Sequence, residues 1–99
     1  MKIDITGRNV EITDALEVNI KNKLKRLENH FENIININFI LTVEKERMKA
    51  EALITIKNGN LFADNENKNM YAAIDEVIIK LDRQLRKQKE KIIDHRWNQ

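Results

Sequence analysis

The sequence lacks cysteine, serine and proline, and it contains only two glycines. Without cysteine the chain forms no disulfide, has no thiol nucleophile and binds no metal through sulfur. Without serine there is no serine nucleophile, and two glycines are too few for a loop that cradles phosphate. His30 and His95 are far apart, and neither has a partner at metal-ligand spacing. The sequence therefore predicts a binding protein with no catalytic site, no cofactor and no metal.

Long apolar runs are also missing, so we expect no membrane span. The N-terminal residues Met1, Lys2, Ile3 and Asp4 alternate in polarity and lack the apolar stretch of a signal peptide, which indicates a cytoplasmic protein. Hydrophobic residues make up 41% of the chain and charged residues 34%, as in globular proteins. A chain of 99 residues suits one domain. We expect that domain to cover residues 1–99, with 93–99 forming a short C-terminal tail.

The spacing of apolar residues predicts four strands and two helices. The expected strands cover residues 2–6, 34–43, 48–57 and 61–65, and the expected helices cover 14–31 and 70 to about 95. A strand, a helix and a strand in succession imply a right-handed parallel crossover. The expected fold is an α/β (α+β) two-layer sandwich in the order β-α-β-β-β-α, with both helices on one face of a four-stranded mixed sheet.

Several local details follow from the same patterns. Thr13 is expected to cap the first helix, which has acidic residues in its first turn. In the second strand, Ile35 is placed on the same face as the other odd-numbered apolar residues, and Ile34 on the opposite face. Asn58 and Gly59 are expected to form a two-residue hairpin turn, because both tolerate positive φ.

Basic residues gather near the C-terminus. Between residues 80 and 91 there are six cations and only two anions, a net charge of +4. Helical geometry places four of these cations, Lys80, Arg83, Lys87 and Lys91, on one stripe away from the apolar stripe, and Arg86 and Lys89 lie next to them in sequence. Two further cations share a face of the first helix. The candidate RNA-binding residues are therefore Lys23, Arg26, Lys80, Arg83, Arg86, Lys87, Lys89 and Lys91.

Two interpretations of these cations are open. A helix over residues 70–95 would be about 39 Å long and would extend beyond the sheet, so it could reach between phosphates and gain affinity from counterion release. An ordinary solvated helix face, with the pairs Glu76–Lys80 and Asp82–Arg86, explains the same pattern. Aromatic residues make up only 5% of the chain, so contacts to the phosphates and shape of folded RNA are favoured over base stacking.

Several motifs resemble the ribosome hibernation promoting factor family. They begin with Val10-Glu11-Ile12-Thr13 and Ala15-Leu16, and continue with Lys23-Leu24 and Arg26-Leu27-Glu28. Next come Val43-Glu44-Lys45 and Lys49-Ala50-Glu51-Ala52. The most specific run is Met70-Tyr71-Ala72-Ala73-Ile74-Asp75, followed by Lys80-Leu81-Asp82-Arg83-Gln84-Leu85 and Lys87. The resemblance covers roughly residues 1–92 without large gaps.

This resemblance implies a fold similar to that of double-stranded-RNA-binding domains, and a protein that is not an enzyme. It implies binding to the small ribosomal subunit and its 16S rRNA at the decoding channel, where messenger RNA and the A- and P-site transfer RNAs would lie. Translation would be blocked by steric exclusion, and inactive ribosome dimers would be promoted. The family's RNA-facing positions match Lys23, Arg26, Lys80, Arg83, Lys87 and Lys91, while Arg86 and Lys89 are added from their position.

The sequence ends at Gln99, so the resemblance is to the short type, which works with a separate ribosome modulation factor. A long-type protein with a further domain is the alternative. The family's aspartate before Met70 is Asn69 here, which keeps a helix-capping side chain. We expect the free protein to be a monomer.

A general double-stranded-RNA binder and a protein-interaction module using Ile92 and Ile93 are the competing functions. Replacing Lys80, Arg83 and Lys87 by glutamate is expected to weaken RNA binding and leave the fold intact.

Overall fold

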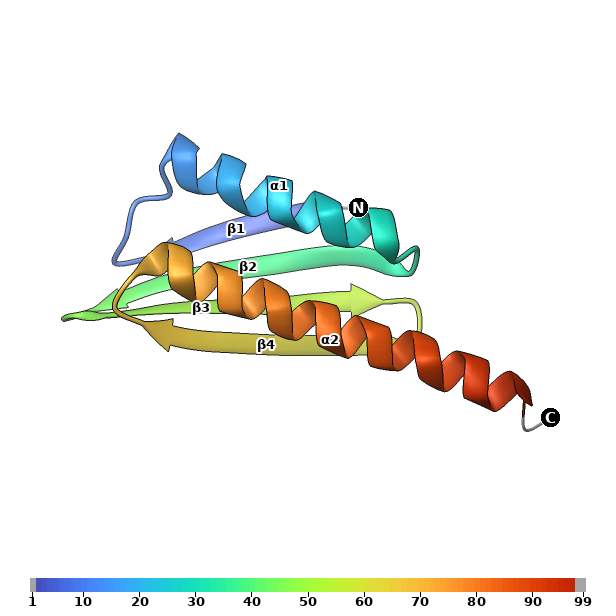
Figure 1. Cartoon of the computed structure of the whole chain (residues 1–99). Coiled ribbons are helices and arrows are strands. Elements are labelled where there is room, and N and C mark those ends of the chain that lie inside the picture. Colours follow the sequence, from blue (N-terminus) through green and yellow to red (C-terminus); the bar gives the residue numbers. More distant parts are fainter. Residues whose placement is uncertain (1, 98–99) are drawn as a thin grey trace.

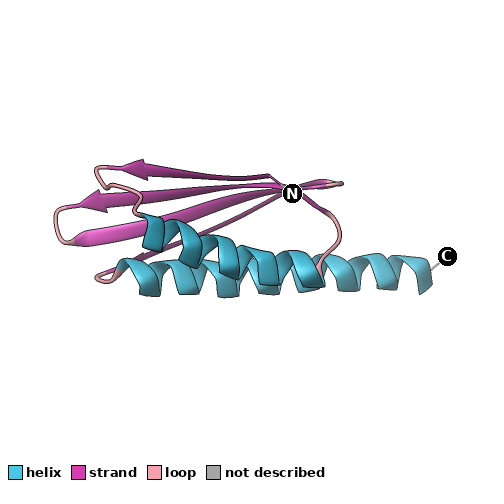
Figure 2. Ribbon diagram, turned by 90° about the horizontal axis from the view of Figure 1, so that it is seen from above, coloured by secondary structure: helices cyan, strands magenta, loops and turns pink. Residues whose placement is uncertain are grey.

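The protein is a four-stranded sheet with two helices on one face (Figures 1 and 2). The computed structural model describes the backbone of residues 2–97 and the side chains as far as Gln88. The elements in chain order are β1 (Lys2–Arg8), α1 (Asp14–His30), β2 (Ile34–Glu44), β3 (Arg47–Ile56), β4 (Gly59–Asn67) and α2 (Met70–Trp97). This confirms the predicted order and the two-layer architecture.

The strands lie in the order β1-β2-β3-β4, with β1 parallel to β2 and the other neighbours antiparallel. The sheet is therefore mixed, as predicted, and β1 and β4 are its edges. Both helices run in the same direction, opposite to β1, β2 and β4 (Figure 1). This arrangement puts the outward-facing sides of α1 and α2 on one surface of the molecule.

The core lies between the helices and the sheet. From α1 it contains Leu16, Ile20, Leu24 and Leu27, and from α2 it contains Met70, Ala73, Ile74, Val77, Leu81 and Leu85. Ile37, Phe39 and Leu41 of β2 are fully buried below the helices. The residues of β3 and β4 in the core include small ones, Ala50, Ala52 and Ala63, which allow α2 to pack closely on this half of the sheet.

Side chains cap the N-terminus of each helix. Leu16 N donates to Thr13 Oγ1 over 3.2 Å, so the predicted cap of α1 is confirmed. Tyr71 N donates to Asn69 Oδ1 over 2.8 Å, and Ala72 N donates to the same oxygen over 3.3 Å. Asn69 therefore caps α2, in line with the expectation that it keeps this role.

β1 is longer than predicted, because pairing with β2 continues from Lys2 to Arg8 through Gly7. A Cβ atom on Gly7 would collide with the backbone oxygen of Val10 and crowd the side chain of Ile12. Glycine is therefore needed here for close approach of the chain that follows. The turn itself is made after the strand, where Asn9 has a φ of 58°.

Two predictions about β2 and the β3–β4 turn are wrong. Ile34 is buried and Ile35 is 53% exposed, because the strand register shifts between Ile34 and Asn36 and reverses the expected faces. Ile56 pairs with Gly59, so the two turn residues are 57 and 58, one position earlier than predicted. Gly59, with a φ of 154°, opens a strand that reaches Asn67 and is longer than the predicted 61–65.

The C-terminal part of α2 extends beyond the end of the sheet, as predicted (Figure 1). Leu85 is its last buried residue among those whose side chains are described. The segment 93–99, which was expected to be a tail, is helical as far as Trp97, and residues 98–99 lie outside the described part of the chain. None of the helices in residues 2–97 is both long and apolar enough to span a membrane.

Replacing Phe39 by alanine should lower the free energy of unfolding by about 3–5 kcal/mol, because the fully buried ring leaves a cavity in the middle of the core. Phe62→Ala is the matched control, since that ring is 51% exposed on the uncovered face of the sheet. Its loss should be about 1 kcal/mol or less. Urea unfolding measures both values, and equal losses would contradict this description of the core.

Candidate nucleic-acid interface

The predicted binding residues lie on both helices, but the structure gives them different surroundings. Lys23 lies on the side of α1 that faces α2, where its Nζ forms an ion pair with Asp75. Its side chain is only 24% exposed. Partial burial, and then the charge of nearby Arg26, lower the pKa of Lys23 below its ordinary value. Lys23 is therefore a partly dehydrated cation that already holds an anion of the protein itself.

Arg26 is exposed, and its side chain forms no hydrogen bond or ion pair with another described residue. Its charge acts on Lys23, which places both cations on the same flank of α1. A phosphate approaching this flank would meet Arg26 first, because Lys23 is more buried and is engaged with Asp75. Arg26 is thus the more accessible of the two α1 candidates.

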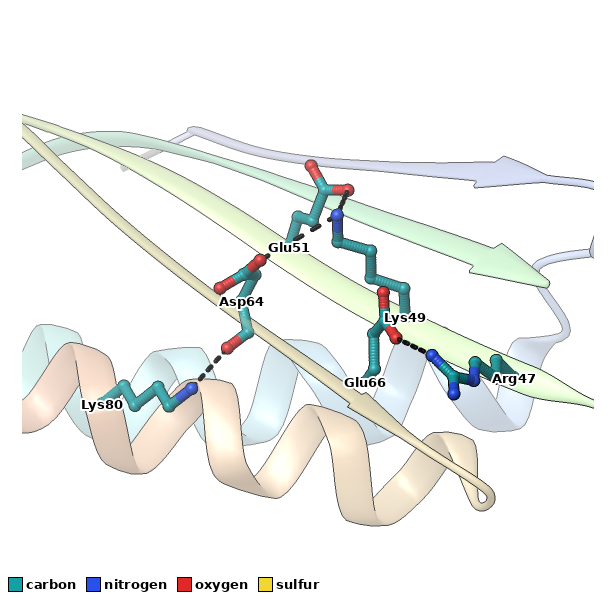
Figure 3. A network of polar contacts seen from close by, with 6 residues as sticks. All are labelled: Arg47, Lys49, Glu51, Asp64, Glu66 and Lys80. Carbon is teal, nitrogen blue, oxygen red and sulfur yellow. Dashed lines mark hydrogen bonds and ion pairs between the residues drawn. The ribbon is translucent and has the colours of Figure 1, made fainter. Parts of the chain in front are cut away.

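Lys80 differs from the predicted free cation. It is half-buried, and its Nζ donates a hydrogen bond to the backbone oxygen of Asp64 over 2.6 Å (Figure 3). The pair Glu76–Lys80 considered from the sequence is not formed. The expectation that Lys80 could be replaced without affecting the fold stays a prediction, and this hydrogen bond argues against it, because the ammonium compensates a carbonyl at the edge of β4.

Arg83 and Lys87 fulfil the prediction of an exposed basic stripe. Both side chains are exposed, and neither is bound to an acid of the described residues. One turn of helix separates them, on the flank of α2 that faces away from α1. Free cations at this spacing can contact successive phosphates, so these two residues form the most accessible part of the candidate interface on α2.

Arg86 lies on the outer side of α2 and donates from Nε to Asp82 Oδ2 over 2.9 Å, so the predicted Asp82–Arg86 pair is confirmed. Its side chain remains 67% exposed, which leaves other guanidinium donors facing solvent. Lys89 and Lys91 follow on the overhanging part of α2, and their side chains lie outside the described residues. Their part in the interface stays a prediction.

The uncovered face of the sheet has a network that sequence reasoning missed (Figure 3). Lys49 Nζ lies 3.3 Å from Glu51 and 3.9 Å from Asp64, and Arg47 lies 3.3 Å from Glu66. A hydrogen bond to Glu51, and then the charge of that carboxylate, raise the pKa of Lys49. Because acids compensate these cations, this face is less suited to a polyanion than the helices.

The alternation of residues along the third strand is enough to place Lys49 and Glu51 on one face of the sheet. Which residues of β4 lie beside them depends on the register between strands.

At the β2–β3 hairpin, an open hollow is lined by residues of both charges, including Glu44, Lys45, Arg47 and Glu66. No group of histidine, cysteine or acidic side chains that could hold a metal occurs within the described part of the chain.

Comparison with known proteins identifies relatives along almost the whole chain. The family described as Sigma 54 modulation protein / S30EA ribosomal protein matches residues 3–93. A ribosome hibernation promoting factor of Pseudomonas putida is 46% identical over 91 residues, which are 92% of this chain and 89% of the relative. That of Escherichia coli K12 is 42% identical over 95 residues, which are 96% of this chain and 100% of the relative.

Solved structures agree with this relationship. A ribosomal subunit interface protein from Coxiella burnetii superposes with a TM-score of 0.83 at 30% identity, covering 91% of this chain and 99% of that one. The N-terminal domain of Protein Y from Thermus thermophilus gives a TM-score of 0.82 at 30% identity, covering 88% of this chain and 98% of that one. Both likenesses extend over nearly the complete fold.

Asp75 should weaken nucleic-acid binding, because it occupies Lys23. We expect Asp75→Asn to tighten binding to ribosomes by up to about fivefold at low salt, as the lysine becomes available to a phosphate. The slope of log affinity against log salt should steepen by about one unit. Binding measured across a salt series tests this.

Glu76→Gln is the matched control for Asp75→Asn. Glu76 is the neighbouring exposed carboxylate, so the change removes the same charge, but no described cation is paired with it. The control should steepen the salt slope less than Asp75→Asn does. Identical slopes for the two variants would show that Lys23 gains no phosphate contact when its partner is removed.

Proposed function

Because this chain belongs to the Sigma 54 modulation protein / S30EA ribosomal protein family, whose members act in ribosome hibernation and are not enzymes, we propose that it binds the small ribosomal subunit at the decoding channel. There it would contact 16S rRNA and exclude messenger RNA and the A- and P-site transfer RNAs. Translation would stop because the channel is occupied, and no bond would be made or broken.

The observation that supports this proposal is the outward display of free cations on two parallel helices. Arg26 on α1 and Arg83 and Lys87 on α2 are exposed and unengaged by described acids. Each phosphate that they neutralise releases condensed counterions, which favours binding and makes it dependent on salt. Most protein contacts to phosphate position the protein without reading a base sequence, which suits a factor that recognises one folded surface.

The shape of the molecule supports steric exclusion. Its extents are 52 × 22 × 18 Å, and the longest one includes the overhang of α2 (Figure 1). The overhang is a single helix beyond the end of the sheet, so it can enter a groove that the globular part cannot. Lys89 and Lys91 on this segment would add contacts in the proposed complex.

The remaining parts of the proposal concern assembly. We propose that residues 1–99 act as a single ribosome-binding domain, which is monomeric when free and works in the cytoplasm, where ribosomes are. Through binding, the protein would promote inactive ribosome dimers, with a separate ribosome modulation factor as its partner. The family relationship supports this role.

Replacing Arg83 and Lys87 by glutamate tests the proposed interface more cleanly than a variant that includes Lys80. Both side chains are exposed, so the fold should remain intact. Binding to purified small subunits should weaken greatly, and the salt slope should fall by about one unit for each lost phosphate contact. Circular dichroism and thermal unfolding verify that the variant is folded.

Lys57→Glu with Lys68→Glu is the matched control. These exposed lysines lie in the β3–β4 turn and before α2, so the same change in net charge occurs away from the proposed interface. The control should bind nearly as the unmodified chain does. Equal weakening in both variants would mean that only net charge matters, and normal binding by Arg83→Glu with Lys87→Glu would remove α2 from the interface.

A further inference from the structure

Two side chains of α2 reach the outer edge of the sheet. Lys80 Nζ donates to the backbone oxygen of Asp64 over 2.6 Å, and Gln84 Nε2 donates to the backbone oxygen of Phe62 over 2.8 Å. β4 is an edge strand that pairs only with β3, so these oxygens have no partner strand. We refer to the two hydrogen bonds as the edge contacts; the first is visible in Figure 3.

The spacing of the edge contacts fits the geometry of both elements. The donors are four residues apart on the helix, which corresponds to a rise of about 6 Å. The acceptors are two residues apart on the strand, which corresponds to about 6.8 Å. α2 runs antiparallel to β4, so the later donor meets the earlier acceptor. The two bonds therefore fix the helix against the strand at two points on one flank.

The edge contacts also occur where support for α2 ends. Leu81 and Leu85 hold the same turns on the core side, and Leu85 is the last described side chain that is buried. From there the helix continues to Trp97 past the end of the sheet (Figure 1). Residues 86–97 span about 18 Å, so a rotation of about 10° at this point would move the tip by about 3 Å. Such a movement exceeds the tolerance of a hydrogen bond to phosphate.

From this geometry we infer that Lys80 and Gln84 are positioning residues, which fix the direction of the overhanging basic segment of α2 before it meets RNA. The inference rests on the proposed function and deepens it. Lys80 would act by holding α2 against the edge of the sheet. Gln84 would act in the same way, and because it is uncharged, charge patterns do not identify it. Preorganisation of this kind improves affinity because less conformational freedom is lost on binding.

The distance between two spin labels, one on α1 and one on the overhang, reports the direction of the overhang in the free protein. The chain has no cysteine, so Asn29→Cys at the end of α1 and Asp94→Cys on the overhang introduce the only two label sites. The distance distribution should be narrow in this background. The distribution should broaden or shift in Gln84→Met, and further when Lys80→Met is added. Each change removes the hydrogen-bond donor of one edge contact and keeps an unbranched side chain.

Two controls separate positioning from general damage. Lys80→Arg keeps a cationic donor and should keep the narrow distribution. Ile79→Met changes an exposed side chain of the same helix without removing a hydrogen bond, and it should have no effect. Thermal unfolding shows which variants remain folded. A distribution that stays narrow and unshifted in the double variant, Lys80→Met with Gln84→Met, would overturn the inference, whatever happens to ribosome binding.

Binding to small subunits gives the second readout. Gln84→Met should weaken binding roughly threefold to tenfold, as expected for one lost hydrogen bond. The salt slope should stay unchanged, because glutamine carries no charge. A broadened distance distribution with unaltered binding would overturn the positioning role. If the unmodified chain does not bind small subunits, the proposed function fails, but the spin-label result still decides whether the edge contacts direct α2.

Discussion

The burial of two apolar helix stripes against one face of the sheet is the constraint on which the rest of the structure depends. Ile20 and Leu24 from α1 and Ile74 and Leu81 from α2 are inaccessible to solvent, and each fixes the rotation of its helix. Once that rotation is fixed, the charged residues must point between the helices, to the sheet edge or outwards. The basic surface is therefore a consequence of how the core packs.

The same constraint divides the cations into two groups. Lys23 and Lys80 lie beside the core stripes and are used within the protein, by Asp75 and by the backbone of β4. Arg26, Arg83 and Lys87 lie farther round the helices and are exposed. The number of basic residues alone does not distinguish these two groups. In the proposed complex, the outer group would contact phosphates, while the inner group would hold the helices in the orientation that makes those contacts possible.

Apolar periodicity predicts the element order and the length of α2, and residue type predicts the cap at Thr13. The mixed sheet follows from the general rule for a strand, a helix and a strand in succession. Periodicity failed at Ile34 and Ile35, where a shift in strand register reverses the two side chains. Asn58 and Gly59 were misplaced in the turn by one residue for a related reason, since the pairing of β3 with β4 fixes the turn.

For the candidate site too, the sequence predicts features within one helix but not contacts between distant elements. Helical geometry predicted that Arg83 and Lys87 are exposed on α2, and the structure confirms this exposure. It could not show that Lys80 binds the backbone of Asp64, sixteen residues earlier, or that Gln84 binds Phe62, because the helix and β4 meet only in the folded protein. Lys89 and Lys91 remain predictions of helical geometry alone.

Competition on purified small ribosomal subunits tests the central claim most directly. The protein is sedimented with subunits at low salt, with and without messenger RNA and transfer RNAs bound in the A and P sites. The account predicts that the chain co-sediments with empty subunits and is displaced by those ligands. Co-sedimentation that is unchanged when messenger and transfer RNAs fill the channel would contradict it, because the protein would then bind elsewhere on the subunit.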